Sequence, residues 1–314
     1  MDYTTAGVDI EGGDRFARFI ASIQSKAVSS GIGGFSGGIP FDPSRYKKPL
    51  LMSTTDGVGT KLLVAMRLQK FDTLGIDLVA MNVNDLAVCG VQPLSFLDYI
   101  AIGRLNDELL HSIIKGVVAG CEMAGCVLVG GETAEMPDLY HGGDFDLAGF
   151  CVGIGEKDEM LPRLGEMSAG DKLYGIPSSG VHSNGLSLAR KALPEGGEDW
   201  KELLVPTRIY VKELMQLTSS GTISAAAHIT GGGLEGNLVR VLAPGLAPRL
   251  SWDWETPAIF AKIAQGGRIA SGEMRKVFNM GVGIALVVSR TKENEFLSAA
   301  KGMAVFPLGE LVRG

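Results

Sequence analysis

Cysteines and long apolar runs are both scarce in this chain. Four cysteines occur in 314 residues, and none forms a Cys-x-x-Cys pair, so neither a zinc cluster nor a dithiol redox site is indicated. The longest apolar stretch, around 281–288, is too short to cross a bilayer. The first residues lack the basic, apolar and small-residue succession of a signal peptide. We therefore expect a cytoplasmic protein with buried, reduced thiols and no membrane partner.

Charge of either sign is also limited. The net charge is −6 and no basic run is present, so nucleic acid is not an expected partner. In contrast, 46% of the residues are hydrophobic, which suffices for a sizeable core and excludes disorder as the main state. Glycine is abundant: the 44 glycines are about twice the usual share of roughly 7%. They must serve turns and close backbone approaches.

The spacing of apolar residues predicts a mixed succession of helices and strands. Helices are expected over 14–29, 72–88, 107–124, 186–193, 203–217 and 234–242, with a further one that opens at the 56–61 turn and continues to 66. Strands are expected over 49–54, 94–102, 126–129, 146–155, 172–176 and 284–288. The two types do not alternate strictly, so the fold class is α+β (mixed α/β) rather than a doubly wound sheet. A charged segment with proline and glycine at 156–171 divides the chain into domains 1–165 and 166–314.

The sharpest motif spans 54–61, between a predicted strand and a predicted helix. Gly57 and Gly59 leave backbone N–H groups accessible, and the start of a helix favours an anion. Lys61 adds a point charge, and Asp56 offers a hard oxygen ligand for Mg²⁺. These are components of a phosphate and metal site, although the spacing is not that of a P-loop. The alternative is a tight turn with a capping Asp and a surface Lys.

Two further carboxylates occur in unusual settings. Asp85 interrupts an apolar helical stretch, on the same face as Asn82, and Glu132 follows a short apolar strand, three residues before Glu135. A carboxylate is seldom buried without a partner, so Asp85 is a candidate for facing a cation. Glu132 is a candidate because it lies at the C-terminal end of a strand, where ligand crevices commonly open. A salt-bridged or helix-capping Asp85 and a polar loop around Glu132 are the alternatives.

Three polar or glycine-rich loops complete the candidates. The loop 178–185 combines hydroxyls, an amide and His182, a set that can hold phosphate or polarise a carbonyl, unless His182 is a structural histidine. The loop 230–237 contains a literal G-x-G-x-x-G; because the residues before it appear helical, we expect a phosphate cradle rather than a dinucleotide site. The loop 33–38 could close over a nucleotide as a lid or could be a disordered surface loop.

Taken together, these segments resemble the phosphoribosylformylglycinamidine cyclo-ligases, also called aminoimidazole ribonucleotide synthetases. The resemblance covers nearly the whole chain in the family's order, at 6–10, 33–38, 55–61, 75–81, 83–86, 96–99, 129–137, 148–153, 178–185, 206–212, 229–233 and 278–283. Residues 194–203 form a shorter segment than expected for the family, and 243–254 fit it only loosely.

The resemblance implies ATP-dependent closure of formylglycinamidine ribonucleotide to aminoimidazole ribonucleotide, in purine biosynthesis, through an iminophosphate. It implies Mg²⁺ at Asp56, Asp85 and Glu132, with His182 and Lys61 in catalytic roles. The nucleotide would be held by Gly33, Gly34, Phe35, Gly57, Val58, Gly59, Thr60 and Lys61. The substrate would be held by Ser183, Asn184, Thr230, Gly231, Gly232 and Gly233.

The resemblance also implies a homodimer in which the mixed sheets of the two N-terminal domains pair into a barrel, while each C-terminal α/β domain keeps its own sheet flanked by helices. The competing functions are a sister ATP-using enzyme, such as a selenophosphate synthetase, a thiamine-monophosphate kinase or a hydrogenase-maturation enzyme, and a non-catalytic nucleotide-binding subunit. No cysteine lies in 31–38, whereas selenophosphate synthetases carry a reactive Cys or selenocysteine near this loop. Thiamine-monophosphate kinases lack the complete sequence motif found at 56–61.

Overall fold

The computed structural model describes residues 9–314, so the expectations that fall on residues 1–8 lie outside it. A mixed four-stranded sheet forms the first half, in the order β1 (Pro49–Gly57), β4 (Phe145–Glu156), β2 (Gln92–Ile102) and β3 (Val127–Glu135). β4 is antiparallel to both β1 and β2, and β3 is parallel to β2. The predicted mixed sheet is therefore confirmed, and β1 and β3 lie at its opposite edges.

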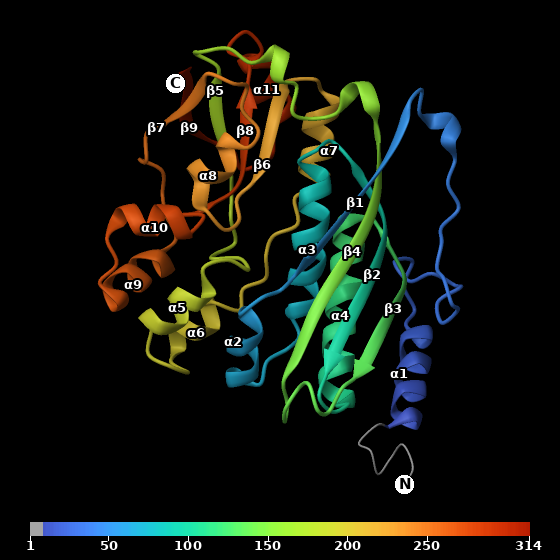
Figure 1. Ribbon diagram of the computed structural model, residues 1–314. Helices are drawn as coiled ribbons and strands as arrows, with labels where there is room; N and C mark the ends of the chain where they lie inside the picture. Colours follow the sequence, from blue (N-terminus) through green and yellow to red (C-terminus); the bar gives the residue numbers. More distant parts are fainter. Residues whose placement is uncertain (1–8) are drawn as a thin grey trace.

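Two long helices cover one face of this sheet (Figure 1): α3 (Leu74–Ala87) and α4 (Asp107–Ala124). α4 occupies the predicted residues, and Asn106 caps it by accepting a hydrogen bond from the Leu109 N–H group. α3 is buried almost along its whole length, because it packs on the sheet on one side and on the second domain on the other. The shorter α1 (Ile10–Ser22) packs on α4, and α2 (Lys61–Leu68) follows β1.

A five-stranded antiparallel sheet forms the second half, in the order β6 (Ile223–His228), β8 (Val282–Val288), β5 (Lys172–Pro177), β9 (Phe306–Arg313) and β7 (Leu246–Leu250). Helices flank it, as predicted: α5 (Leu186–Ala192), α6 (Glu198–Glu202), α7 (Val211–Ser219), α8 (Gly233–Val239), α9 (Ala258–Gly267), α10 (Ser271–Val277) and α11 (Glu293–Ala299). The predicted boundary at 165/166 falls in the connection between β4 and β5, which holds two short 3-10 helices.

Several predicted elements differ from the structure. The predicted helix 203–217 is wrong in its first half: α7 begins only at Val211, and 205–210 form neither helix nor strand. Pro206 lies in this segment. The backbone of the segment is hydrogen-bonded to side chains of α3: Thr207 N–H donates to Asp77, and Tyr210 N–H donates to Asn84. Tertiary hydrogen bonds therefore replace the bonds of a helical turn.

The strand β6 was missed, and it contradicts the expectation that helix directly precedes the 230–237 loop. Its sequence, Ile-Ser-Ala-Ala-Ala-His, has little β-branched character. β6 pairs only with β8, antiparallel, at an edge of the sheet, so it still supplies no β-α-β unit for a dinucleotide. Two other boundaries shift: α1 ends at Ser22 rather than 29, and β3 continues through the Gly130–Gly131 pair to Glu135.

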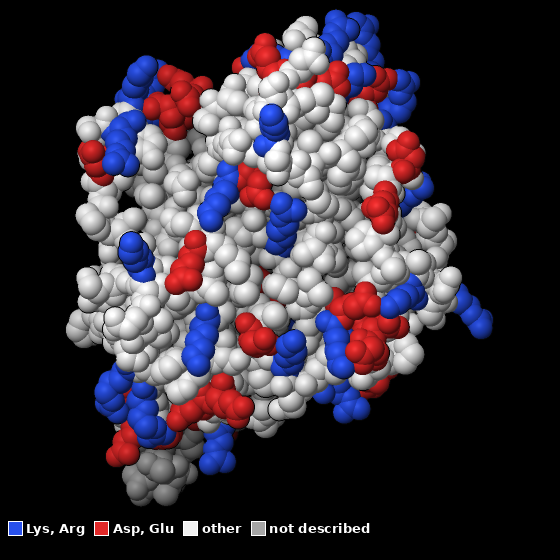
Figure 2. All heavy atoms as spheres, turned by 180° about the vertical axis from the view of Figure 1, so that it is seen from behind, with Lys and Arg blue, Asp and Glu red and all other residues white. Residues whose placement is uncertain are grey.

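The surface carries both signs of charge. Figure 2 shows acidic and basic side chains interspersed over the rear face, without a broad field of either sign. Among residues 9–314, no helix is both long enough and apolar enough to cross a membrane.

Candidate active site

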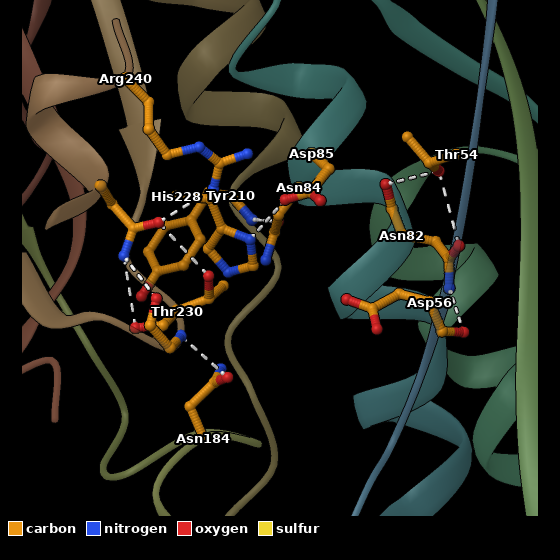
Figure 3. Close-up of polar contacts among 12 residues, drawn as sticks. Thr54, Asp56, Asn82, Asn84, Asp85, Asn184, Tyr210, His228, Thr230 and Arg240 are labelled. Atoms are coloured by element: carbon orange, nitrogen blue, oxygen red, sulfur yellow. Dashed lines mark hydrogen bonds and ion pairs between the residues drawn. The ribbon is translucent and has the colours of Figure 1, made fainter. Parts of the chain in front are cut away.

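Asp56 and Asp85 lie on the same side of the junction between the two domains (Figure 3), near enough for the charge of Asp85 to act on Asp56. Asp56 ends β1, and its Oδ1 accepts a hydrogen bond from the Gly57 N–H group at 2.8 Å. Asp85 lies near the C-terminal end of α3, and its side chain is 47% exposed. Partial burial raises the pKa of Asp56, and the negative charge of Asp85 raises it further. The structure thus brings together two carboxylates that repel each other.

His228, at the end of β6, completes this group from the second domain. Its Nδ1 lies 2.9 Å from Asp85 Oδ1, and its side chain is only 2% exposed. With Nδ1–H as the donor, Nε2 is left as an acceptor, and within the described part of the chain it is buried without a partner. The sequence analysis missed His228 because it did not recognise β6.

Asn82 holds the end of β1 in place rather than facing a cation. Its side-chain amide donates to the backbone oxygen of Leu78 at 2.9 Å and to that of Asp56 at 3.3 Å. Its own backbone oxygen accepts from the Thr54 hydroxyl at 3.2 Å. Figure 3 shows the contacts of Asn82 with Thr54 and Asp56 beside the Asp56 carboxylate. Asn82 of α3 therefore fixes the end of β1 that carries the Asp56 carboxylate.

The glycine turn after Asp56 has the backbone freedom that was expected of it. Gly59 has φ +68, a conformation that favours glycine, and a Cβ there would meet nothing within 4 Å. Thr60 is the N-cap residue of α2, and its hydroxyl lies 3.1 Å from that of Ser187 at the start of α5. The turn is therefore open on one side and joined to the second domain on the other.

Lys61 differs from the expectation of a cation beside this turn. Its side chain is fully buried, and its Nζ lies 2.8–2.9 Å from the Asp77 carboxylate and 2.7 Å from the backbone oxygen of Val205. Burial lowers the pKa of Lys61, and Asp77 opposes that shift. In this structure the ammonium group belongs to the domain junction and does not face the turn.

Asp77, which the motif analysis passed over, is the centre of a buried polar cluster. Besides Lys61, its Oδ1 accepts hydrogen bonds from the Thr207 N–H and hydroxyl groups, both at 2.7 Å, and from the Ser183 hydroxyl at 3.0 Å. Ser183, a predicted substrate ligand, is thus bound within the protein. We name Lys61, Asp77, Ser183 and Thr207 the junction cluster. Lys61 and Asp77 come from the first domain, and the other two come from the second.

His182 is likewise buried, with 1% exposure. Its Nε2 accepts a hydrogen bond from the Ser179 N–H group at 3.1 Å, and its backbone has φ +60. Burial lowers its pKa well below the usual value, and the positive charges of Lys61 and Arg208 contribute to that shift. His182 therefore organises the 178–185 loop as a neutral side chain, whereas the sequence analysis expected it to face the substrate.

The other loop residues predicted to hold the substrate do meet. Asn184 Oδ1 accepts a hydrogen bond from the Gly231 N–H group at 3.0 Å, which ties the 178–185 loop to the glycine loop. Gly232 and Gly233 both have positive φ values, and a Cβ on Gly233 would lie 2.0 Å from the Arg275 backbone oxygen. Beside this loop, Thr230 and Arg240 both contact Asn237 Oδ1 (Figure 3).

Glu132 and the Gly33–Gly34 loop lie away from Asp56 and Asp85 in the structure. They line a cavity of about 320 Å³ at the β3 edge of the first sheet, together with Asp98. β2 and β4 separate that edge from Asp56, about 14 Å at the usual strand spacing. Burial raises the pKa of Asp98 to about 7, and Glu132 adds to it. Phe35 is fully exposed. Within one chain, the three predicted metal ligands are therefore not assembled.

The described residues contain no cluster of three or more His, Cys, Asp or Glu side chains with metal-binding geometry. The Asp56–Asp85 pair nonetheless fits a divalent cation. Both carboxylates are hard oxygen ligands, and neither forms an ion pair with a lysine or arginine among residues 9–314. A bound cation would relieve the repulsion that raises the pKa of Asp56.

Two α/β domains with carboxylates and glycine turns at their junction define a class of two-domain proteins suited to phosphorylated ligands. The chain belongs to the AIR synthase related family: the model of the family's N-terminal domain matches residues 45–155, and that of its C-terminal domain matches residues 168–314.

Curated relatives match over the full length. Proteins named phosphoribosylformylglycinamidine cyclo-ligase from Carboxydothermus hydrogenoformans and Myxococcus xanthus are 46% and 45% identical to the chain. The alignments cover 100% and 99% of this chain and 97% and 96% of the relatives. The family resemblance seen in the sequence is thereby confirmed.

Solved structures share the fold at much lower identity. A hydrogenase maturation protein, HypE of E. coli, aligns with TM-score 0.65 and 14% identity over 96% of this chain and 90% of its own. A thiamine-monophosphate kinase from Stenotrophomonas maltophilia aligns with TM-score 0.64 and 15% identity, over 96% and 93%. These similarities establish the shared fold alone.

Proposed function

We propose that the protein is a phosphoribosylformylglycinamidine cyclo-ligase, which uses ATP to close formylglycinamidine ribonucleotide into 5-aminoimidazole ribonucleotide with release of ADP and phosphate. The observation that carries the proposal is the full-length identity of 44–46% to three relatives of that name. The sister enzymes align at only 14–15%. The neighbouring carboxylates of Asp56 and Asp85 at the domain junction support a catalytic protein over a binding subunit.

The reaction needs an activated oxygen, because an amide oxygen is a poor leaving group. Attack of the substrate's amide oxygen on the terminal phosphorus of ATP releases ADP and gives an iminophosphate. A nitrogen of the same substrate then attacks the activated carbon, the C–O bond to phosphate breaks, and the nitrogen loses a proton. Phosphoryl transfer depends mainly on positioning and charge neutralisation, so no nucleophilic side chain is required.

The residues at the junction fit these needs. Val58, Gly59 and Thr60 form the open turn before α2 and would hold the phosphates of ATP through backbone N–H groups, whereas the N–H group of Gly57, at the end of β1, is donated to Asp56. Asp56 and Asp85 would hold Mg²⁺, which neutralises charge on the phosphates when bound. His228 Nε2, oriented by Asp85, is placed to accept a hydrogen bond from a substrate N–H group.

The second domain would hold the rest of the substrate. Asn184 and the Thr230–Gly233 loop are joined by a hydrogen bond and would bind the ribonucleotide. Ser183, His182 and Lys61 would support these loops from within the junction rather than touch the substrate.

A homodimer is part of the proposal. The face of the first sheet opposite α3 and α4 carries exposed apolar side chains, with Leu51 64% and Phe150 45% exposed. Pairing two such faces would bury them. If the β1 edge of one protomer met the β3 edge of its partner, Glu132 and the Gly33–Phe35 loop would approach the Asp56 site. The double variant L51K/F150K is expected to sediment as a monomer, whereas an unchanged mass would exclude this face.

Cytoplasmic location remains part of the proposal, supported by four free cysteines, three of them buried. The decisive test incubates the full chain with formylglycinamidine ribonucleotide, ATP and Mg²⁺ and follows aminoimidazole ribonucleotide. Formation of the product supports the proposal. Folded protein that hydrolyses ATP without forming it, or forms no product at all, refutes it. Asp158→Asn, at an exposed aspartate paired with Lys48, serves as the control variant with unchanged activity.

A further inference from the structure

A cleft of about 680 Å³ lies between α2 of the first domain and α5 and α6 of the second. Its wall on α2 is formed by Leu63, Met66 and Arg67, which are three and four residues apart and so share one helical face. Lys61 and Leu62, by contrast, are buried in the domain junction. The cleft therefore opens on the side of α2 that faces away from the junction cluster.

The charges in this cleft do not balance. Arg67, Arg190 and Lys191 line it, against a single carboxylate, Glu195. Glu195 is already paired with Arg67, at 3.0 Å between Oε1 and Nε. Among residues 9–314, no carboxylate lies within ion-pair distance of Arg190 or Lys191. Two cations thus face the cleft without a protein counter-charge.

Two N–H groups in the wall of the cleft also lack acceptors. The indole N–H of Trp200, a residue that is 4% exposed, has no hydrogen-bond partner in the described chain, and neither has the buried Nε–H of Arg190. A buried donor without an acceptor costs free energy, so such groups call for an explanation. Both belong to side chains that line the same cleft, and both lack the same thing, an anionic or polar oxygen.

The remaining lining residues define the size and character of a ligand. Leu63, Met66, Leu193 and the indole of Trp200 offer an apolar surface beside the cations. The shortened segment 194–203 supplies Glu195 and Trp200, and its turn passes close to Arg67, whose Nε would lie 3.9 Å from a Cβ on Gly196. A ligand with a phosphate group and a small organic body matches both parts of the lining.

We propose that this cleft binds a phosphate-bearing small molecule, with Arg190 and Lys191 as its anion ligands and Trp200 in its wall. The site is additional to the nucleotide and substrate positions proposed above, because none of its lining residues belongs to either. A ligand seated there would bridge the two domains, since α2 follows the glycine turn directly and α5 follows the 178–185 loop directly.

Tryptophan fluorescence can test this proposal, because the chain has only three tryptophans. In the W252F/W254F variant, Trp200 is the sole reporter. Inorganic phosphate, and then ribose 5-phosphate, are expected to change its emission in a saturable manner that weakens with added salt. Tighter binding of ribose 5-phosphate than of phosphate would support the organic part of the ligand. Arg190→Gln and Lys191→Gln are each expected to weaken binding about tenfold, the typical effect of one charged hydrogen bond.

Lys201→Gln is the matched control, because Lys201 is on α6 but pairs with Glu198 and does not line the cleft. No saturable change of Trp200 emission, or an equal change in the R190Q/K191Q variant, would overturn the proposal. Calorimetry on the otherwise unmodified chain gives an independent check if the W252F/W254F variant does not fold: loss of one phosphate site in R190Q/K191Q supports it, and identical isotherms contradict it. The result does not depend on turnover, because Asp85→Asn is expected to leave the Trp200 signal unchanged.

Discussion

Asp77 and Asp85 lie on the same helix, about two turns apart, yet their surroundings differ in kind. Asp77 is fully buried, is paired with Lys61 and accepts hydrogen bonds from Thr207 and Ser183. Asp85 is about half exposed, and its one side-chain partner within residues 9–314 is His228. The first carboxylate is saturated by protein groups, whereas the second has an oxygen left for a ligand.

This difference separates a structural charge from a chemical one. A buried ion pair whose carboxylate also accepts several hydrogen bonds fixes the relative position of the elements that supply its donors. A carboxylate beside another carboxylate, as Asp85 is beside Asp56, is destabilising until a cation arrives. The junction cluster therefore links the two domains, whereas the Asp56–Asp85 pair is left available for the cation proposed above.

The largest effect is expected when Asp77, the carboxylate bound by protein groups, is replaced. Asp77→Ala leaves Lys61 buried without a counter-charge and three donors without an acceptor. We expect a loss of about 3–5 kcal/mol in the free energy of unfolding, measured by urea titration. The double variant K61M/D77L should regain part of this loss, because it removes both charges. A single-variant loss below about 1 kcal/mol would contradict the structural role.

Replacement of Asp85, the partly exposed carboxylate, should have the opposite effect: a lower rate and nearly unchanged stability. Asp85→Asn is expected to lower the rate of aminoimidazole ribonucleotide formation at least about a hundredfold, since it removes a charge that acts on the transition state. The free energy of unfolding should stay within about 1 kcal/mol of the unmodified protein or rise slightly, because the repulsion on Asp56 is relieved. A comparable loss of stability and rate would show that Asp85, like Asp77, is structural.

The sequence predicted the unsaturated side better than the saturated one. Asp56 and the glycines after it stand in a local pattern, and so does Asp85 in an apolar helix; these patterns need no knowledge of distant contacts. Asp77 stands in the same helix with the same local signal, but its partners Lys61 and Thr207 are 16 and 130 residues away along the chain. Hydrogen bonds and ion pairs with distant groups decide which carboxylate is already bound within the protein, and no local pattern contains them.

The same reason explains the misplaced elements and residues. α4 was predicted residue for residue because its apolar face and its caps are local. Residues 205–210 form no helix because Asp77 and Asn84 of α3 bind their backbone, and the Lys61 side chain is buried because it pairs with Asp77. Glu132 follows a strand as expected, but the order β1-β4-β2-β3 places that strand at the far edge of the sheet from Asp56.

A pH titration can sharpen the comparison through His182, a third polar side chain at this junction. Burial holds its pKa well below the usual value near 6.5, so the folded protein keeps it neutral while the unfolded chain protonates it in acid. The contribution of neutral His182 to the free energy of unfolding is therefore fully present above pH 6.5. Below pH 6.5 it falls by about 1.4 kcal/mol per pH unit.

The variant His182→Asn tests this assignment, because Asn tolerates the positive φ of this position. Urea unfolding at pH 7.5 and pH 5.5 should show a smaller difference in the variant than in the unmodified protein, by roughly 1 kcal/mol. An equal difference in both proteins would mean that the acid sensitivity comes from other groups.

The smallest effect is expected where an ion pair is exposed. Arg67 of the first domain and Glu195 of the second form an ion pair, like Lys61 and Asp77, but their side chains are 59% and 67% exposed. Solvent screens such a pair, so Glu195→Gln should change the free energy of unfolding by less than about 1 kcal/mol. The substitution also removes the only carboxylate lining the cleft, which should tighten its binding of inorganic phosphate. Weaker phosphate binding, or a stability loss as large as that of Asp77→Ala, would place Glu195 with the saturated charges rather than beside a vacant anion site.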